Sequence, residues 1–190
     1  MSLADLVKKN RSYRRFDQET RISKQELVSL VDLARHSASG TNKQPLKFLL
    51  YNGRDDCARI FPYTRWAGYL KDWDGPEEGE RPSAYIIILG DRSVSENYFV
   101  DHGIAAQSML LGATELGYGG CMIASIDRKG LVEEINLPGH YEVLLIVALG
   151  KPVEKVVIDD IVDNRFEYWR DKVGTHHVPK RTLKELIIEL

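Results

Sequence analysis

Residues Ala84 to Leu89 form an unbroken, almost wholly apolar run that limits this chain to folds with a fully buried strand. The run ends at Gly90 and is short enough for one β-strand, and a strand with so few polar side chains has to be buried on both faces. A second run, Val143 to Leu149, is ended by Gly150-Lys151-Pro152. The sequence therefore predicts two buried strands, 84–90 and 143–149.

Helical spacing of apolar residues marks the segments around these strands. Ser23 and Glu26 have the spacing of a capping box, and a stripe of apolar residues at helical intervals follows them. A cap at Ser2 predicts a short first helix through Lys9. The segment 101–116 is a further predicted helix, with small residues that let another backbone approach closely, in the core or at a subunit interface. These small residues are Ala105, Ala106, Gly112 and Ala113.

The remaining elements alternate between strands and helices. We expect strands at 48–51 and 121–126, helices at 55–61 and 127–135, a turn-rich segment at 37–45 and an exposed loop at 74–82. Strands mixed with helices place the chain in the α+β class. Residues 1–190 are predicted to form a single domain. Within it, 151–190 is an extended C-terminal arm with a short helical piece around 164–171 and a final turn capped by Thr182.

Composition excludes several classes of function. The 190 residues are 43% hydrophobic and 28% charged, which is ordinary for a globular protein, and the formal net charge is −2. No bulk positive charge therefore favours nucleic acid or an anionic membrane surface. No apolar run approaches the ~20 residues of a membrane span. The cysteines and histidines have no metal-ligand spacing, so we expect no metal, and a reducing cytoplasm is the expected location.

Three polar motifs, far apart in the sequence, carry the chemistry. Arg11-Ser12-Tyr13-Arg14 places guanidinium groups three residues apart, so that both can face one anionic ligand. The turn-rich segment contains Ser39, Asn42 and Gln44, and its amides offer both donors and acceptors. Lys180-Arg181 is a basic pair before the last helical turn. Each motif alone also has an ordinary explanation as a solvated basic stretch, loop hydrogen bonding or a basic pair in water.

In this order, the motifs resemble those of the FMN-dependent nitroreductase family, and the chain resembles a short branch of it from about Leu3 to Leu186. In that family an N-terminal Arg-Ser-x-Arg, a Ser/Asn-x-Gln-Pro loop and a C-terminal basic pair close around one FMN. Gly117 to Ser125 resembles the family's glycine-rich turn into the strand at the flavin edge, where the backbone N–H of Ala124 or Ser125 would face N5. The resemblance implies these FMN-binding residues: Arg11, Ser12, Arg14, Ser39, Asn42, Gln44, Met122, Ile123, Ala124, Ser125, Lys180 and Arg181.

The resemblance also implies a fold, a partner and an activity. The fold would be nitroreductase-like, a central, mainly antiparallel sheet flanked by helices, with the C-terminal arm exchanged in a homodimer. Hydride would pass from NAD(P)H through flavin N5 to a nitroaromatic, a quinone or a related small-molecule acceptor by ping-pong exchange. No catalytic side chain is implied, because the flavin carries the chemistry. Nothing resembles an adenylate site, which disfavours FAD.

Two alternatives to this activity remain open. One is a flavin-binding module without turnover. The other is a branch with a specialised reduction substrate, such as an enone, a halogenated phenol or flavin itself. The dimer has independent support, because small residues line helix 101–116 and the segment after Pro152 is long for a loop without a core pattern. That segment is expected to lie on a partner or on its own core.

Residues outside the motifs receive plainer interpretations. Cys121 lies in an apolar strand and is interpreted as inert core. Asp101 and His102 are interpreted as a charged helix start and nothing more. The aromatic residues between 66 and 73 fit two descriptions equally well, core side chains or a hydrophobic wall over a ligand. They are Trp66, Tyr69 and Trp73.

Overall fold

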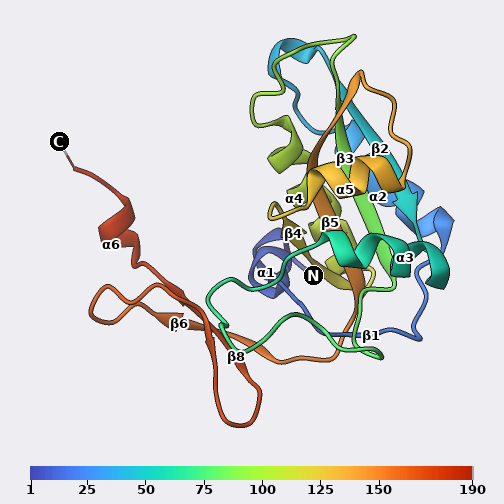
Figure 1. The fold of residues 1–190 in the computed structure, drawn as a ribbon. Helices are drawn as coiled ribbons and strands as arrows, with labels where there is room; N and C mark the ends of the chain where they lie inside the picture. Colours follow the sequence, from blue (N-terminus) through green and yellow to red (C-terminus); the bar gives the residue numbers. More distant parts are fainter. Residues whose placement is uncertain (190) are drawn as a thin grey trace.

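A computed structural model, which describes residues 1–189, places both predicted buried strands at the centre of one five-stranded sheet (Figure 1). Its strands are β1 (Phe16–Asp17), β2 (Leu46–Tyr51), β3 (Ala84–Asp91), β4 (Gly119–Ile123) and β5 (Tyr141–Pro152). They follow the order β1-β5-β3-β2, β4 also pairs with β5, and all these pairs are antiparallel. The two apolar runs are thus neighbours, β3 and β5, and the mainly antiparallel sheet is confirmed.

The position of β3 explains its unbroken apolar sequence. Successive side chains of a strand point to opposite faces of the sheet. Ile86 and Ile88 pack into one core and Ile87 and Leu89 into the other, and each of these side chains is at most 2% exposed. Both alternating sets of side chains in β3 therefore have to be apolar, because each set faces a core.

Helices cover both faces of the sheet, as predicted. The first core lies under α2 (Lys24–Arg35) and α4 (Asp101–Glu115), and the second under α3 (Arg54–Ile60), η2 (Phe61–Tyr63) and α5 (Arg128–Glu134). The capping box of α2 is present, since Ser23 Oγ accepts from the Glu26 N–H at 3.2 Å and Glu26 Oε2 accepts from the Ser23 N–H at 2.8 Å. α1 (Leu3–Lys9) is capped at Ser2 and buries none of its residues.

The small residues of α4 serve packing within one chain. A Cβ on Gly112 would lie 2.3 Å from Leu33 Cδ1 of α2, so the missing side chain of this glycine lets the leucines of α2 pack directly against α4. Ala105 and Ala113 are buried in the same core. These residues therefore support the core alternative, and they give no independent support for a subunit interface.

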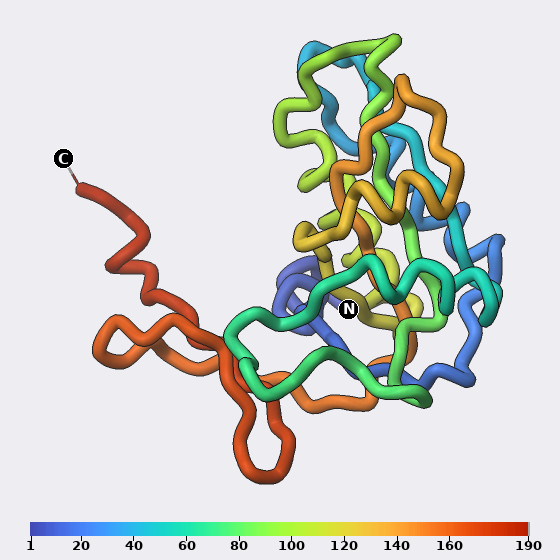
Figure 2. Tube along the Cα trace, in the orientation of Figure 1, coloured from blue at the N-terminus to red at the C-terminus, as the bar shows by residue number. Residues whose placement is uncertain are grey.

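The C-terminal arm leaves the body and forms a sheet of its own (Figures 1 and 2). In it, β8 (His176–Lys180) pairs in parallel with β6 (Val156–Asp160) and antiparallel with β7 (Trp169–Arg170), and α6 (Leu183–Leu186) follows. The predicted helical piece around 164–171 is wrong. Asp163 and Asn164 have φ of 51° and 58°, which ends any right-handed helix, and β7 pairs with β8 instead. The cap at Thr182 is confirmed.

Some strand boundaries differ from the prediction. β4 ends at Ile123 instead of Ile126, and the Ser125 carbonyl accepts from the Arg65 N–H at 3.0 Å instead of continuing the sheet. β5 runs on to Pro152, because Lys151 and Pro152 pair with β1. Within residues 1–189, no helix is both long and apolar enough to cross a membrane.

Candidate functional site

A groove of about 780 Å³ opens between α1, the residues that follow it, α4, β4 and the arm strand β8. Five predicted site residues meet in it: Arg11, Ser12, Arg14, Met122 and Lys180. Its remaining polar lining includes Asn10, Gln107, Tyr168 and His176, and its apolar lining includes Leu3, Val7, Leu110, Leu111 and Val178. In the described part of the chain no acidic side chain lines this groove.

Residues 10–15, which we call the strap, extend the sheet at the outer edge of β4. Ser12 bridges Gly120 in parallel, and the Tyr13 N–H donates to the Gly120 carbonyl at 3.1 Å. A Cβ on Gly120 would lie 2.2 Å from the Ala148 carbonyl oxygen, so glycine is required there. Arg14 Nη1 donates to the Ser12 carbonyl at 3.2 Å. The strap is therefore fixed by backbone pairing and carries Arg11 and Arg14 to the groove.

His176, the first residue of β8, is fully buried and lies beside Arg14. Its Nε2 is 3.2 Å from Arg14 Nη1. Because a guanidinium can only donate, Nε2 accepts this bond and the imidazole is neutral. Burial, together with the positive charges of Arg14 and Arg170, lowers the pKa of His176 to about 4. The positive charge of the groove at neutral pH therefore comes from Arg11, Arg14 and Lys180.

The predicted loop at 39–44 lies elsewhere, beside a smaller pocket of about 170 Å³ that Ser39, Gln44 and Asp101 help to line. The loop contains η1 (Gly40–Asn42), and its residues Thr41, Asn42 and Gln44 have φ of 50°, 55° and 53°. Such left-handed conformations in non-glycine residues cluster at functional sites. Within one chain, Ser39, Asn42 and Gln44 do not line the groove that holds Arg11 and Arg14.

Asp101 anchors this loop, so its interpretation as only a charged helix start is wrong. Asp101 is 3% exposed, and its carboxylate accepts from Ser39 Oγ at 2.6 Å and from the Gly40 N–H at 2.9 Å. Ser39 Oγ in turn accepts from the Gln44 N–H at 3.0 Å. An acid at a helix start also suits the helix dipole, which is why sequence reasoning missed its second role.

The remaining predicted site residues do not line the groove, and they are Ile123, Ala124, Ser125 and Arg181. Ile123 is 4% exposed and points into the second core, so it offers a ligand only backbone. Ala124 and Ser125 are exposed just beyond β4. Arg181 does not line the groove; it donates to Asn164 Oδ1 at 2.9 Å and pairs with Glu185 at 3.4 Å.

The aromatic segment and the cysteines have separate places in the fold. Trp66 is 8% exposed and belongs to the second core, whereas Tyr69 is half-exposed and contacts Tyr168 of the arm, with ring centroids 5.0 Å apart. Cys57 and Cys121 are buried and unpaired, and burial raises the pKa of each thiol to about 12. The interpretation of Cys121 as core is confirmed. Within residues 1–189, no cluster of His, Cys, Asp or Glu has the arrangement of a metal site.

The profile of the nitroreductase family matches residues 7–68 and 78–151, which is most of the chain. This chain belongs to the nitroreductase family. The matched residues include the strap, the loop at 39–44, Asp101 and β4, while the arm lies beyond the match. The resemblance inferred from the three motifs is thus confirmed.

Known nitroreductase-like proteins are similar over most of their length. YodC of Bacillus subtilis (strain 168), named as a candidate NAD(P)H nitroreductase, is 21% identical over 180 residues, covering 79% of this chain and 89% of YodC. The iodotyrosine deiodinase of Thermotoga neapolitana is 24% identical over 165 residues, covering 79% of this chain and 88% of the enzyme.

Solved structures show the same fold. A nitroreductase family protein of Clostridium difficile 630 superposes with a TM-score of 0.69 at 20% identity, covering 99% of this chain and 98% of its own. An FMN-dependent nitroreductase of Clostridium difficile R20291 superposes with a TM-score of 0.64 at 21% identity, covering 80% of this chain and 89% of its own. The nitroreductase-like fold is therefore confirmed.

Proposed function

We propose that this protein is an FMN-dependent NAD(P)H oxidoreductase that holds its cofactor in the groove. The charge of the groove carries the proposal, because every charged side chain that lines it is cationic while much of the remaining lining is apolar. FMN has the same division, with a dianionic phosphate at one end and a broad apolar ring at the other. Arg11, Arg14 and Lys180 would hold the phosphate, since guanidinium and ammonium groups form charge-assisted hydrogen bonds with it.

The neutral lining fits the rest of the cofactor. Asn10, Ser12 and Gln107 offer donors and acceptors for the ribityl hydroxyls. Met122 is 38% exposed and, with Leu110 and Leu111, offers apolar surface for the ring. The volume of about 780 Å³ lies within the roughly 300–1,000 Å³ usual for small-molecule sites.

FMN, when bound, supplies hydride transfer between NAD(P)H and an electron acceptor. The chain's own residues would bind and orient it, and we infer that the exposed residues Ala124 and Ser125 offer their backbone N–H groups to the flavin edge. Neither cysteine takes part, because a thiol with a pKa of about 12 stays protonated at neutral pH.

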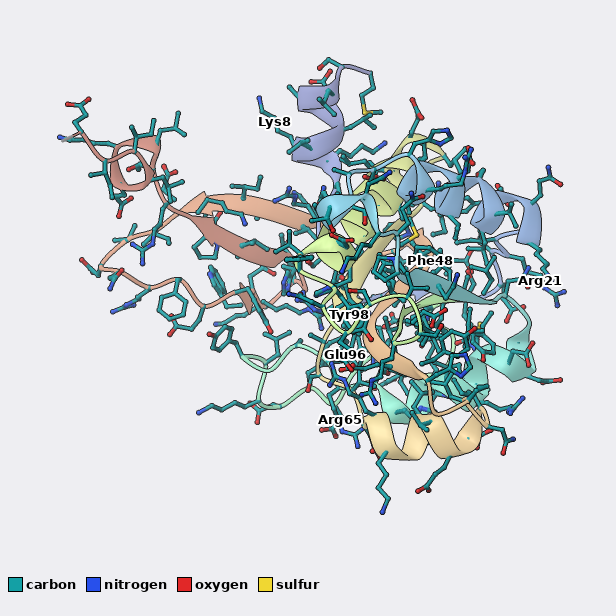
Figure 3. All side chains as sticks on the ribbon, turned by 90° about the horizontal axis from the view of Figure 1, so that it is seen from above. Lys8, Arg21, Phe48, Arg65, Glu96 and Tyr98 are labelled. Atoms are coloured by element: carbon teal, nitrogen blue, oxygen red, sulfur yellow. The ribbon has the colours of Figure 1, made fainter. Side chains whose placement is uncertain are left out.

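The same proposal includes a homodimer with the cofactor at the subunit interface. Both the groove and the pocket of the 39–44 loop border α4, yet in one chain they remain separate. A second copy could therefore bring its Ser39, Asn42 and Gln44 to the groove. The arm supports this arrangement, because it projects from the body (Figure 3). It also exposes apolar side chains such as Ile188, which is 80% exposed.

Spectroscopy of the purified protein tests the cofactor. We expect flavin absorption in the visible range and a released chromophore with the mass of FMN. Variants Arg11→Gln and Lys180→Gln should retain less FMN than Arg181→Gln, the matched control whose side chain lies outside the groove. A colourless protein that cannot be reconstituted with FMN would refute the proposal.

Steady-state kinetics tests the activity. NAD(P)H oxidation should be stimulated by nitroaromatics or quinones, with parallel double-reciprocal lines that indicate ping-pong exchange. Halogenated phenols belong in the same panel, because an iodotyrosine deiodinase is among the similar proteins. Selective turnover of a halogenated phenol or an enone would favour a specialised branch. Bound FMN without stimulation by any acceptor would favour a binding module.

A further inference from the structure

Glu154 is a buried carboxylate that none of the motifs contains. Its side chain is only 1% exposed and lies where the chain leaves β5 for the arm. One carboxylate oxygen, Oε1, accepts from the backbone N–H groups of Arg14 and Arg15, the latter at 3.2 Å. The other, Oε2, accepts from Arg170 Nη2 of β7 at 2.9 Å. A single side chain at the start of the arm therefore joins the strap to β7.

Losing these hydrogen bonds would cost the fold a large amount of free energy. A buried carboxylate is tolerated only when it is paired and hydrogen-bonded, and removing one partner leaves a charge without compensation. The surroundings hold the partners in place: the Arg170 guanidinium stacks on Trp73 at 4.2 Å, and the Val153 N–H donates to the Arg15 carbonyl at 3.1 Å. The link thus has one defined geometry.

The two segments that Glu154 joins bring the opposite sides of the groove together. The strap supplies Arg11 and Arg14, and β8 of the arm supplies Lys180 and His176. β7, which carries Arg170, is paired with β8 through Arg170 and His176 themselves. A shift of β7 and β8 away from Glu154 would therefore move Lys180 away from Arg14.

We propose that Glu154 is a positioning residue that couples occupancy of the groove to docking of the arm. The proposal rests on the proposed function, because it takes the ligand to be FMN with its phosphate between Arg14 and Lys180. A ligand that bridges strap and arm stabilises the docked arm, and by thermodynamic reciprocity a docked arm raises the affinity for that ligand. Glu154 does not itself line the groove and does not touch the ligand in this scheme; it contacts the groove residue Arg14 through the backbone N–H of that residue.

The variants Glu154→Gln and Arg170→Met break the link to the arm from its two sides. Glutamine keeps a carbonyl oxygen for the strap N–H groups but cannot form the ion pair with Arg170. Glu134→Gln is the matched control, because Glu134 accepts from Arg59 Nε at 2.7 Å between α5 and α3, away from the groove. All variants are first compared by circular dichroism and light scattering, which check fold and assembly.

Two readouts are measured on the full chain, FMN affinity by quenching of flavin fluorescence and tryptic cleavage at Lys172. That lysine is exposed in the turn between β7 and β8. Both variants should bind FMN about tenfold more weakly, within the usual range of coupling between sites, and should be cleaved faster. FMN should slow cleavage of the wild type and of Glu134→Gln, and have little effect on Glu154→Gln. The double variant should bind no more weakly than either single one, since both act through one link.

The outcomes separate the two proposals. Unchanged FMN affinity in Glu154→Gln, or cleavage of that variant at the wild-type rate, would overturn the coupling. Strictly additive losses in the double variant would overturn it as well. A wild type that binds no FMN would instead refute the proposed function, while cleavage of the ligand-free chains would still decide whether Glu154 holds the arm.

Discussion

Tyr85 carries a hydroxyl that the core does not satisfy. The residue is fully buried in β3, and within residues 1–189 its Oη has no hydrogen-bond partner. Burial raises the pKa of this phenol well above its ordinary value, so the group stays neutral. A buried, unpaired hydroxyl costs free energy that a phenyl ring does not. Tyr85→Phe should therefore raise the free energy of unfolding by about 1 kcal/mol, measured by urea denaturation at one protein concentration.

Tyr118→Phe is the matched control, because Tyr118 Oη donates to Glu26 Oε1 at 3.0 Å. That variant should lose about 1 kcal/mol, since it removes a hydrogen bond that is made. Destabilisation by Tyr85→Phe of the same size would mean that a bound water or ligand satisfies the hydroxyl.

His176 predicts a dependence of stability on acidic pH. Its pKa is near 6.5 when unfolded and about 4 when folded, because it is buried and faces Arg14, Arg170 and His177. Between these values the unfolded chain binds the extra proton, so this contribution to stability is full above pH 6.5 and is lost as the pH falls toward 4. His176→Gln keeps an acceptor for Arg14 and does not titrate. Urea denaturation at pH 7 and pH 4.5 should show a smaller loss in the variant, and equal losses would contradict the assignment.

At the residue scale, the sequence identified the cationic residues of the groove, but it did not identify the buried carboxylates that hold the site's segments in place. Arg11, Arg14 and Lys180 stand in motifs and do share a groove. Asp101 and Glu154 are ordinary acids in the sequence, because their partners lie far along the chain. Burial and partners of such a carboxylate depend on tertiary structure, and no local pattern encodes them.

At the scale of elements, the loop at 39–44 depends on α4 for its shape. Three of its non-glycine residues have positive φ, which stores strain that the Asp101 carboxylate must offset. Asp101→Asn loses one acceptor and the charge, so we expect a loss of about 1–2 kcal/mol in stability and weaker binding of FMN. Glu115→Gln, at the exposed other end of α4, is the control and should change neither. Thermal unfolding and FMN titration check both, and unaltered FMN affinity in Asp101→Asn would contradict a cofactor role for the loop.

The elements themselves were predictable to different degrees. Capping boxes and buried apolar runs have strong local signals, and the structure has α2, β3 and β5 where those signals lie. The small sheet of the arm has no such signal. Its strands β6 and β8 pair in parallel across a long connection and mix polar with apolar residues, so neither alternation nor a buried run reveals them.

At the scale of the whole molecule, the C-terminal arm supplies one side of the groove. It carries Lys180 to the strap of its own chain and then continues outward through α6, whose Leu183 is 73% exposed. An apolar segment that projects from the body in this way favours a partner surface, and two-fold dimers are the commonest homo-oligomers. Light scattering should therefore find twice the calculated 21.6 kDa of one chain. A monomer that still holds FMN would refute the dimer.

Truncation separates the two roles of the arm. A chain that ends at Pro179 lacks both Lys180 and α6, so it should dimerise more weakly and bind FMN more weakly. The full-length variant Lys180→Gln should keep the dimer and lose about tenfold in FMN affinity, because a charge-assisted hydrogen bond contributes about 1.5 kcal/mol or more. A chain that ends at Leu186 should keep Lys180 and its FMN affinity while losing the exposed Ile187 and Ile188 from the interface. An intact dimer with undiminished FMN affinity in the Pro179 chain would show that the arm contributes to neither.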